Sequence, residues 1–219
     1  MQAKQFDLIV FDWDGTLFDS TALITHCIQA SAVDLGLPAP SAAAASYVIG
    51  LGLQDALAHA VPELPTARYG EMGLRFRHHY LAAQDQLTLF NGTLEMLAGL
   101  KTRQHRLAVA TGKSRRGLDE ALQAVQLQGI FDSTRTADET SAKPHPQMLL
   151  ELMDELGVAA QRTLMIGDTT HDLQLALNAG TASIGVGYGA HEHSNFSAYK
   201  PLHVAQSMSE LHAWLMEYA

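Results

Sequence analysis

The feature that most constrains this chain is a pair of carboxylates placed directly after a short apolar run. Residues 6–11 are apolar except for one aspartate, and the segment Asp-Trp-Asp-Gly-Thr follows at 12–16. Such a run predicts a strand that is buried on both faces, as in a parallel sheet. Side chains two residues apart on an extended chain point the same way, so we expect Asp12 and Asp14 to lie close together.

Two such carboxylates are costly to place side by side. At a separation of about 4 Å and an effective dielectric constant of about 20, they repel by roughly 4 kcal/mol. A divalent cation removes this repulsion, and carboxylate oxygens are ligands that suit Mg2+. Gly15 allows a sharp turn after the pair, and the hydroxyl of Thr16 can close that turn by a local hydrogen bond. The segment therefore predicts a site with Mg2+ as its cofactor.

Size and charge limit the classes of protein to consider. A chain of 219 residues has room for one or two domains with a sizeable core. Its formal net charge of -9 argues against a nucleic-acid partner and against an acidic membrane surface. The single cysteine, Cys27, excludes an internal disulfide and fits a reducing compartment. No apolar run is long enough for a membrane span and the N-terminus has no signal-peptide pattern, so we expect a cytoplasmic protein.

Strand and helix patterns alternate along most of the chain. Buried strands are predicted at 106–110, 163–166 and 182–186, and helical patterns separate them. This alternation is typical of an α/β fold with a doubly wound parallel sheet.

The stretch that follows the first strand breaks this alternation. It is alanine-rich and helical up to about residue 87, and Ser20 is a candidate cap for its first helix. A block of this length is too long for an ordinary crossover connection. We therefore expect residues 17–87 to form a smaller, inserted all-helical domain, with 1–16 and 88–219 forming the α/β core.

Polar side chains follow three of the predicted strands. Asp12 and Asp14 follow the first, Thr111-Gly112-Lys113 follows the second, and a Gly-Asp-Thr-Thr-His-Asp segment at 167–172 follows a later one. Lys143 opens a helical region between the last two. Ligands of open α/β sheets bind at the carboxyl ends of the strands. The sequence therefore predicts that these side chains share one site.

Together these segments resemble the motifs of the haloacid dehalogenase (HAD) superfamily, most of all its phosphoglycolate phosphatase-like members with a helical cap. The segment 12–20 resembles the first motif, Thr111 the second and Lys143 the third, and Asp168 with Asp172 resembles the acidic motif. The four matches span nearly the whole core in the family's order. The resemblance implies a Rossmann-like core, a hydrolase that forms an aspartyl-phosphate, and a cap that closes over the active site.

The resemblance also implies a role for each residue. Asp12 would be the nucleophile, and Asp14 the general acid that later becomes the general base. The Thr111 hydroxyl and the backbone at Gly112 would bind the phosphoryl group, and Lys143 would balance the negative charge there.

The metal site follows from the same resemblance. Mg2+ would be held by Asp12, by the backbone carbonyl of Asp14 and by Asp168. Asp172 would support the metal indirectly, through a water molecule or through hydrogen bonds.

Other charged residues near the motifs have simpler interpretations. Lys113, Arg115 and Arg116 fit a solvated helix face better than an anion site. His191 and His193 fit a solvated loop better than a metal site, which would need a third ligand. His171 lies within the acidic motif, but the sequence gives it no role.

The resemblance also implies that residues of the cap select the substrate. Candidates are residues 18–23 and the loop Gly50-Leu51-Gly52, whose glycines are equally well explained as helix breakers. Arg68, Arg75 and Arg77 are candidate cap cations for a substrate carboxylate, although exposed arginine is the default expectation on an amphipathic helix.

These features predict a Mg2+-dependent phosphatase of a small phosphorylated metabolite, with a 2-phosphoglycolate-like phosphomonoester favoured. A pyrophosphatase or phosphomutase of the same superfamily stays open. Three other classes of protein fit less well. A dehalogenase needs no metal and does not require an acid and base at the position of Asp14. A receiver module is about half this length, and a non-catalytic phosphate-binding protein should lack one of the motif residues. Monomer and homodimer are both compatible with the sequence.

Overall fold

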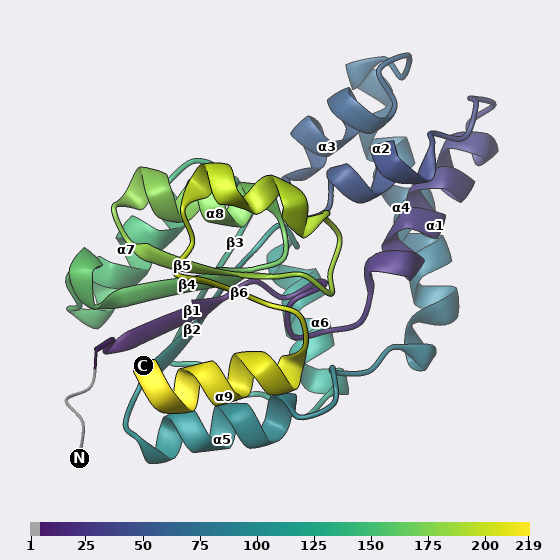
Figure 1. Cartoon of the computed structure of the whole chain (residues 1–219). Coiled ribbons are helices and arrows are strands. Elements are labelled where there is room, and N and C mark those ends of the chain that lie inside the picture. Colours follow the sequence, from purple (N-terminus) through teal and green to yellow (C-terminus); the bar gives the residue numbers. More distant parts are fainter. Residues whose placement is uncertain (1–4) are drawn as a thin grey trace.

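The computed structural model describes residues 5–219, and within them six parallel strands form one central sheet (Figure 1). The order across the sheet is β3-β2-β1-β4-β5-β6. The central strand β1 pairs with β2 on one side and with β4 on the other. The bounds are β1 Leu8–Phe11, β2 Arg106–Thr111, β3 Ser133–Thr136, β4 Thr163–Gly167, β5 Ala182–Val186 and β6 His203–Ala205. The carboxyl ends of β1, β2 and β4 therefore lie side by side.

Helices cover both faces of the sheet. One face packs against α5 (Thr93–Thr102), α6 (Arg115–Ala124) and α9 (Met208–Tyr218), and the other against α7 (Gln147–Leu156) and α8 (Thr170–Ala179). Along β1, Ile9 and Phe11 point into the first layer and Leu8 and Val10 into the second. Both sets are fully buried, as expected for a parallel strand. The predicted doubly wound α/β fold is confirmed.

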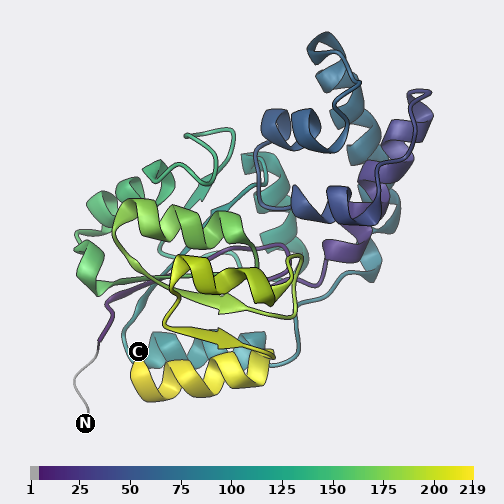
Figure 2. The ribbon, with the colours of Figure 1, turned by 45° about the horizontal axis from the view of Figure 1, so that its top comes forward.

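Four helices stand beyond the carboxyl ends of the strands and form what we call the cap (Figures 1 and 2). They are α1 (Thr21–Asp34), α2 (Ala42–Tyr47), α3 (Leu53–Ala60) and α4 (Tyr69–Ala83). Their apolar side chains pack mainly against one another, in a cluster separate from the two layers beside the sheet. The cap therefore has a small core of its own.

The chain passes between core and cap at two neighbouring points. On the way out, the Asp19 amide donates to the Thr88 carbonyl at 3.0 Å, and on the way back the Phe90 amide donates to the Leu17 carbonyl at 3.0 Å. The two connections are thus tied together as a short pair of extended segments. Within residues 5–219, no helix has the length and apolar character needed to cross a membrane.

Candidate active site

Lys143 lies between two buried carboxylates. Its Nζ donates to Oδ1 of Asp12 and to Oδ1 of Asp172, at 2.6 Å in each case. All three side chains are at most 1% exposed. Burial lowers the pKa of Lys143, but the two carboxylates outweigh that effect and raise it above its ordinary value. The lysine is therefore charged, and it joins the end of β1 to the start of α8.

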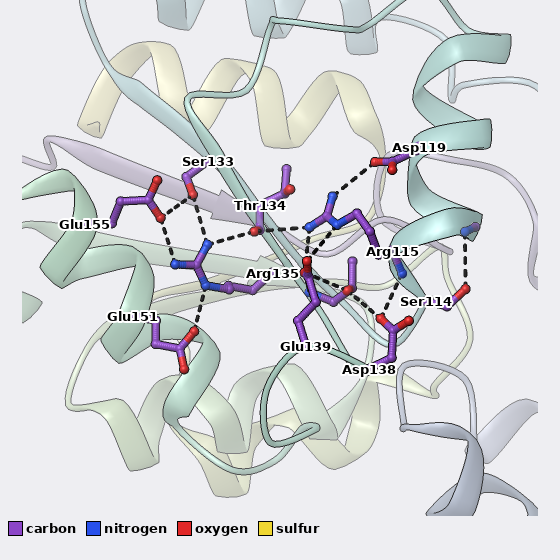
Figure 3. A network of polar contacts seen from close by, with 12 residues as sticks. Ser114, Arg115, Asp119, Ser133, Thr134, Arg135, Asp138, Glu139, Glu151 and Glu155 are labelled. Carbon is purple, nitrogen blue, oxygen red and sulfur yellow. Dashed lines mark hydrogen bonds and ion pairs between the residues drawn. The ribbon is translucent and has the colours of Figure 1, made fainter.

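Lys143 lies in the connection between β3 and α7. A network of ion pairs holds this connection in place (Figure 3). Arg115 Nη2 donates to Glu139 Oε2 at 2.7 Å. Arg135 Nε donates to Glu151 Oε2, also at 2.7 Å, and so ties β3 to α7. Because ion pairs hold both ends of this connection, they also restrict the position of Lys143 within it.

Asp172 is oriented by the start of its own helix. Its Oδ2 accepts hydrogen bonds from Thr169, at 3.1 Å from the amide and at 2.7 Å from the hydroxyl. This is the capping box of α8, in which an N-terminal acid satisfies free backbone donors. Oδ1 is thereby left to face Lys143.

Asp168 is held from two sides at the end of β4. Its Oδ1 accepts from the Thr16 hydroxyl at 2.9 Å and its Oδ2 accepts from the Ala190 amide at 2.7 Å. The expectation that Thr16 closes its own turn through its side chain was therefore wrong, because the hydroxyl reaches across to β4. Gly15 has a φ of +83°, and a Cβ there would lie 2.2 Å from Asp168 Oδ2. Glycine is required for this close approach.

The carboxylates form a donor set that fits a divalent cation. Asp12, Asp168 and Asp172 each offer an oxygen within 4.8 Å of the others. Asp12 Oδ2 is buried and has no hydrogen-bond partner among residues 5–219. When all three carboxylates are ionised, the single positive charge of Lys143 offsets only one of them in this buried space. Hard oxygen donors with this charge suit Mg2+.

Burial changes the proton affinity of these carboxyl groups. It raises the pKa of Asp12 to about 7, because the opposing effect of Lys143 does not offset the loss of solvent. Burial likewise raises the pKa of Asp168 well above its usual range, and the charges of Asp12 and Asp172 raise it further. Without a cation, the folded protein therefore binds protons that the unfolded chain releases.

This predicts that the metal-free protein loses stability as the pH rises. The stabilisation from protonated Asp12 is complete below its unfolded pKa of 3.8 and is lost as the pH passes its folded pKa of about 7. Between about pH 5 and pH 8, Asp12 should account for a fall of about 2–3 kcal/mol in the free energy of unfolding.

Urea unfolding with a chelator, at both pH values, measures this fall. Asp12→Asn should reduce the pH dependence, and Mg2+ should restore stability at the higher pH. Equal pH dependence in the variant and the wild type would contradict the raised pKa.

Asp14 has a different set of partners from Asp12. Its Oδ1 accepts from the Ser20 hydroxyl at 2.6 Å and lies 3.0 Å from Lys113 Nζ. Ser20 precedes α1, but its side chain makes no capping hydrogen bond, because its hydroxyl is used by Asp14. Lys113 Nζ lies 3.5 Å from the hydroxyl of Tyr80 in α4 and 4.9 Å from the centre of its ring.

The interpretation of Lys113, Arg115 and Arg116 as a solvated face was wrong for Lys113. The side chain of Lys113 is 12% exposed and that of Arg115 is 31% exposed within its network, whereas Arg116 is 75% exposed. Burial lowers the pKa of Lys113, but Asp14 and Tyr80 outweigh it and raise the pKa above the ordinary value. The prediction failed for Lys113 because α6 begins only at Arg115. Lys113 therefore lies in the turn between β2 and α6 and not on the exposed face of the helix.

Thr111 and Gly112 lie at the end of β2, beside the cap. Thr111 is buried, and its Oγ1 accepts from the amide of Lys113 at 3.2 Å. A Cβ at Gly112 would lie 2.6 Å from both the carbonyl carbon and the oxygen of Gly50, and 2.7 Å from the oxygen of Leu51. The cap loop therefore rests directly on this turn.

Replacing Gly112 with alanine should displace the cap loop. The obstructing atoms are backbone, so they cannot rotate aside, and misplacement of this size should lower kcat/KM by about 10- to 100-fold. Gly70→Ala is the matched control, since a Cβ at Gly70 in α4 meets no atom within 4 Å among the described residues. Steady-state kinetics of both variants test this. Equal activity in the two would contradict a contact that matters for catalysis.

Two histidines of the core hold the backbone of the cap. His171 Nε2 and His191 Nε2 donate to the Tyr47 carbonyl at 2.8 and 2.9 Å. The ring of His191 also stacks on that of Tyr47, with centroids 5.1 Å apart. The prediction of a solvated loop was wrong for His191, which is 9% exposed, whereas His193 is exposed. Burial lowers the pKa of both His171 and His191, which favours the neutral rings.

A cleft of about 410 Å³ opens between cap and core beside these contacts. It reaches Lys143 and is lined by Tyr47, Leu51, Asp55, Ala58, His59, Lys143, Pro144 and His171.

The structure brings all the motif residues to one edge of the sheet, at the carboxyl ends of β1, β2 and β4. The contributions of Tyr80 and of the Tyr47 carbonyl carry no signal in the sequence, because they depend on how the cap packs.

Residues 9–186 match the haloacid dehalogenase-like hydrolase family. The chain is 38% identical over 210 residues to a "Probable phosphatase IndB" of Dickeya dadantii, covering 93% of this chain and 91% of that protein. It is 30% identical over 207 residues to a phosphoglycolate phosphatase of Aliivibrio fischeri, covering 90% and 91%.

The fold is shared with solved structures as well. A crystal structure of a haloacid dehalogenase-like hydrolase from Bacteroides fragilis matches with a TM-score of 0.86 at 24% identity, covering 94% of this chain and 99% of that one. The family match covers most of the chain and all four motif segments, so the resemblance of the motifs is confirmed. This protein is a hydrolase and belongs to the haloacid dehalogenase-like hydrolase family.

Proposed function

We propose that this hydrolase is a Mg2+-dependent phosphatase that acts on a small phosphorylated metabolite through a phosphoryl group on Asp12. One observation carries the proposal: two carboxylates on one strand end are paired with different lysines. Asp12 contacts Lys143 at 2.6 Å, and Asp14 contacts Lys113 at 3.0 Å. Carboxylates in different environments can take different roles, one as nucleophile and the other as acid and base.

In the first half-reaction, Asp12 attacks phosphorus. Lys143 donates to Oδ1 of Asp12 and would hold the carboxylate in place for the attack. The bond between phosphorus and the ester oxygen breaks, and its electron pair goes to that oxygen. Asp14 donates a proton to it, and the alcohol leaves.

In the second half-reaction, a water oxygen attacks the phosphorus of the phosphorylated Asp12. Asp14, now a carboxylate, takes the proton of that water. The bond between phosphorus and Asp12 breaks, which releases inorganic phosphate and restores the carboxylate. Lys143, whose Nζ lies 2.6 Å from Asp12 Oδ1, compensates negative charge near the phosphoryl group.

The metal site in this proposal uses the buried carboxylates. Asp12, Asp168 and the backbone carbonyl of Asp14 would hold Mg2+, and Asp172 would support the site through Lys143 and the capping box. When bound, Mg2+ supplies the positive charge that lets an anionic nucleophile approach an anionic phosphoryl group. The cluster of three carboxylates, with its net negative charge, supports this assignment.

We also propose a substrate class and a domain division. The relative named a phosphoglycolate phosphatase supports a small phosphomonoester of that type. Residues 17–87 would act as the cap and would open to admit the substrate and close over Asp14. Thr111, Gly112 and Lys143 would bind the phosphoryl oxygens.

Phosphate release from a panel of substrates tests the proposal. The panel contains 2-phosphoglycolate, sugar phosphates, nucleoside monophosphates, pyrophosphate and an aryl phosphate, each with Mg2+ and with a chelator. We expect release that requires the metal, with one clear favourite. No release from any substrate by folded protein would contradict the phosphatase assignment.

A further inference from the structure

We propose that Lys113 selects the substrate by binding an anionic group on its leaving alcohol, next to the ester oxygen. The proposal rests on the proposed phosphatase function and names the substrate class: phosphate esters, or anhydrides, whose leaving group carries a carboxylate or a phosphate. Lys113 lies at the seam between the core and α4 of the cap, with its side chain 12% exposed. Lys143, by contrast, is fully buried between Asp12 and Asp172.

The position of Lys113 follows from the position of the acid. Asp14 must come within hydrogen-bond distance of the leaving oxygen in order to protonate it. Ser20 and Lys113 both contact Oδ1 of Asp14, which leaves Oδ2 to face that oxygen. A group one carbon away from the leaving oxygen therefore comes within reach of Lys113 Nζ, which is 3.0 Å from Oδ1.

The ammonium group of Lys113 has unused binding capacity. It carries three donors, and within residues 5–219 its polar contacts are Asp14 at 3.0 Å and the Tyr80 hydroxyl at 3.5 Å. The second distance is at the long end of the hydrogen-bond range. Asp14 is also held by Ser20 at 2.6 Å, so the lysine is not needed merely to fix that carboxylate. A substrate anion can therefore bind at little cost to the site.

The arginines around the seam are less suited to this role. Arg77 of α4 forms an ion pair with Glu120 at 2.8 Å, and Arg68 forms one with Glu71 at 2.9 Å. Arg115 pairs with Glu139 at 2.7 Å. A chain with a formal net charge of -9 needs a local cation for an anionic leaving group, and Lys113 is the cation that contacts the acid.

The test compares two esters that differ in this charge. Values of kcat/KM are measured with Mg2+ for 2-phosphoglycolate and for 2-hydroxyethyl phosphate, which carries a neutral hydroxymethyl group in place of the carboxylate. We expect the wild type to prefer the charged ester, and Lys113→Met to reduce that preference by about 10- to 100-fold, as for the loss of a charge-assisted hydrogen bond. Lys113→Arg should keep most of it, and pyrophosphate shows whether a phosphate serves as the anion.

A binding measurement separates selection from effects on chemistry. In the Asp12→Asn background, calorimetry should show that Lys113→Met weakens binding of 2-phosphoglycolate by a similar factor but leaves 2-hydroxyethyl phosphate nearly unchanged. Equal losses for both esters in both experiments would overturn the proposal and leave Lys113 as a support for Asp14. Failure of the phosphatase function itself would look different, because no substrate would release phosphate, including the aryl phosphate.

Discussion

Asp12→Asn is expected to abolish phosphate release, with a loss of about 10⁴-fold or more in kcat, as is usual when a nucleophile is removed. The amide keeps the shape of the side chain but is not a nucleophile. The fold should survive, because Asp12 Oδ2 has no hydrogen-bond partner among the described residues and the substitution removes a buried charge. Steady-state kinetics with thermal unfolding of the same sample measure both effects.

Asp14→Asn is the matched control. The same change two residues away removes the acid and base but keeps the nucleophile. An aryl phosphate has a good leaving group that needs no acid, so this variant should still release the aryl alcohol in a single burst. Substantial steady turnover by Asp12→Asn would contradict the assigned roles.

Lys143→Met should strongly destabilise the metal-free protein. It leaves Asp12 and Asp172 buried without the cation that lies 2.6 Å from each, and breaking such a pair costs about 3–5 kcal/mol. Because the carboxyl groups can take up protons instead, the loss should be larger at pH 8 than at pH 5. Chemical unfolding with a chelator measures it, and Mg2+ should recover part of the stability.

An exposed lysine provides the comparison. Lys101 lies 2.7 Å from Asp132, but both side chains are about one-third exposed, at 33% and 36%. Lys101→Met should therefore cost no more than about 1 kcal/mol. Equal losses at the two positions would mean that Lys143 is not the counter-ion of a buried cluster.

Most of the fold was predictable because its signals are local. The run before Asp12 is apolar on both faces, and only a strand covered by two helical layers buries both sets of side chains. The strands at 106–110, 163–166 and 182–186 carry the same signal, and β2 and β4 each extend one residue further. The doubly wound topology followed from their alternation with helices.

The positions of the motif residues were also accessible from the sequence, because parallel strands bring their carboxyl ends to one edge. The structure does place Asp12, Lys143, Asp168 and Asp172 there in mutual contact or proximity. Their chemical roles stay predictions. What the sequence alone did not provide is the pairing of each carboxylate with its own lysine.

The errors arose where a side chain reaches across the fold. Thr16 bonds to Asp168, 152 residues away, and His191 bonds to the cap backbone at Tyr47. Lys113 is buried because Tyr80 of α4 lies over it. Neighbouring residues in the sequence do not reveal such contacts, because they depend on how the cap meets the core.

In the proposed mechanism, Asp12 itself carries the phosphoryl group. The most direct test is to mix Asp14→Asn with Mg2+ and an aryl phosphate, quench in acid, and map the phosphoryl adduct by peptide mass spectrometry. We expect a single adduct on the peptide that contains Asp12, and none when Asp12→Asn is added to the variant. An adduct on another residue, or release of the aryl alcohol in a burst with no adduct at all, would contradict it.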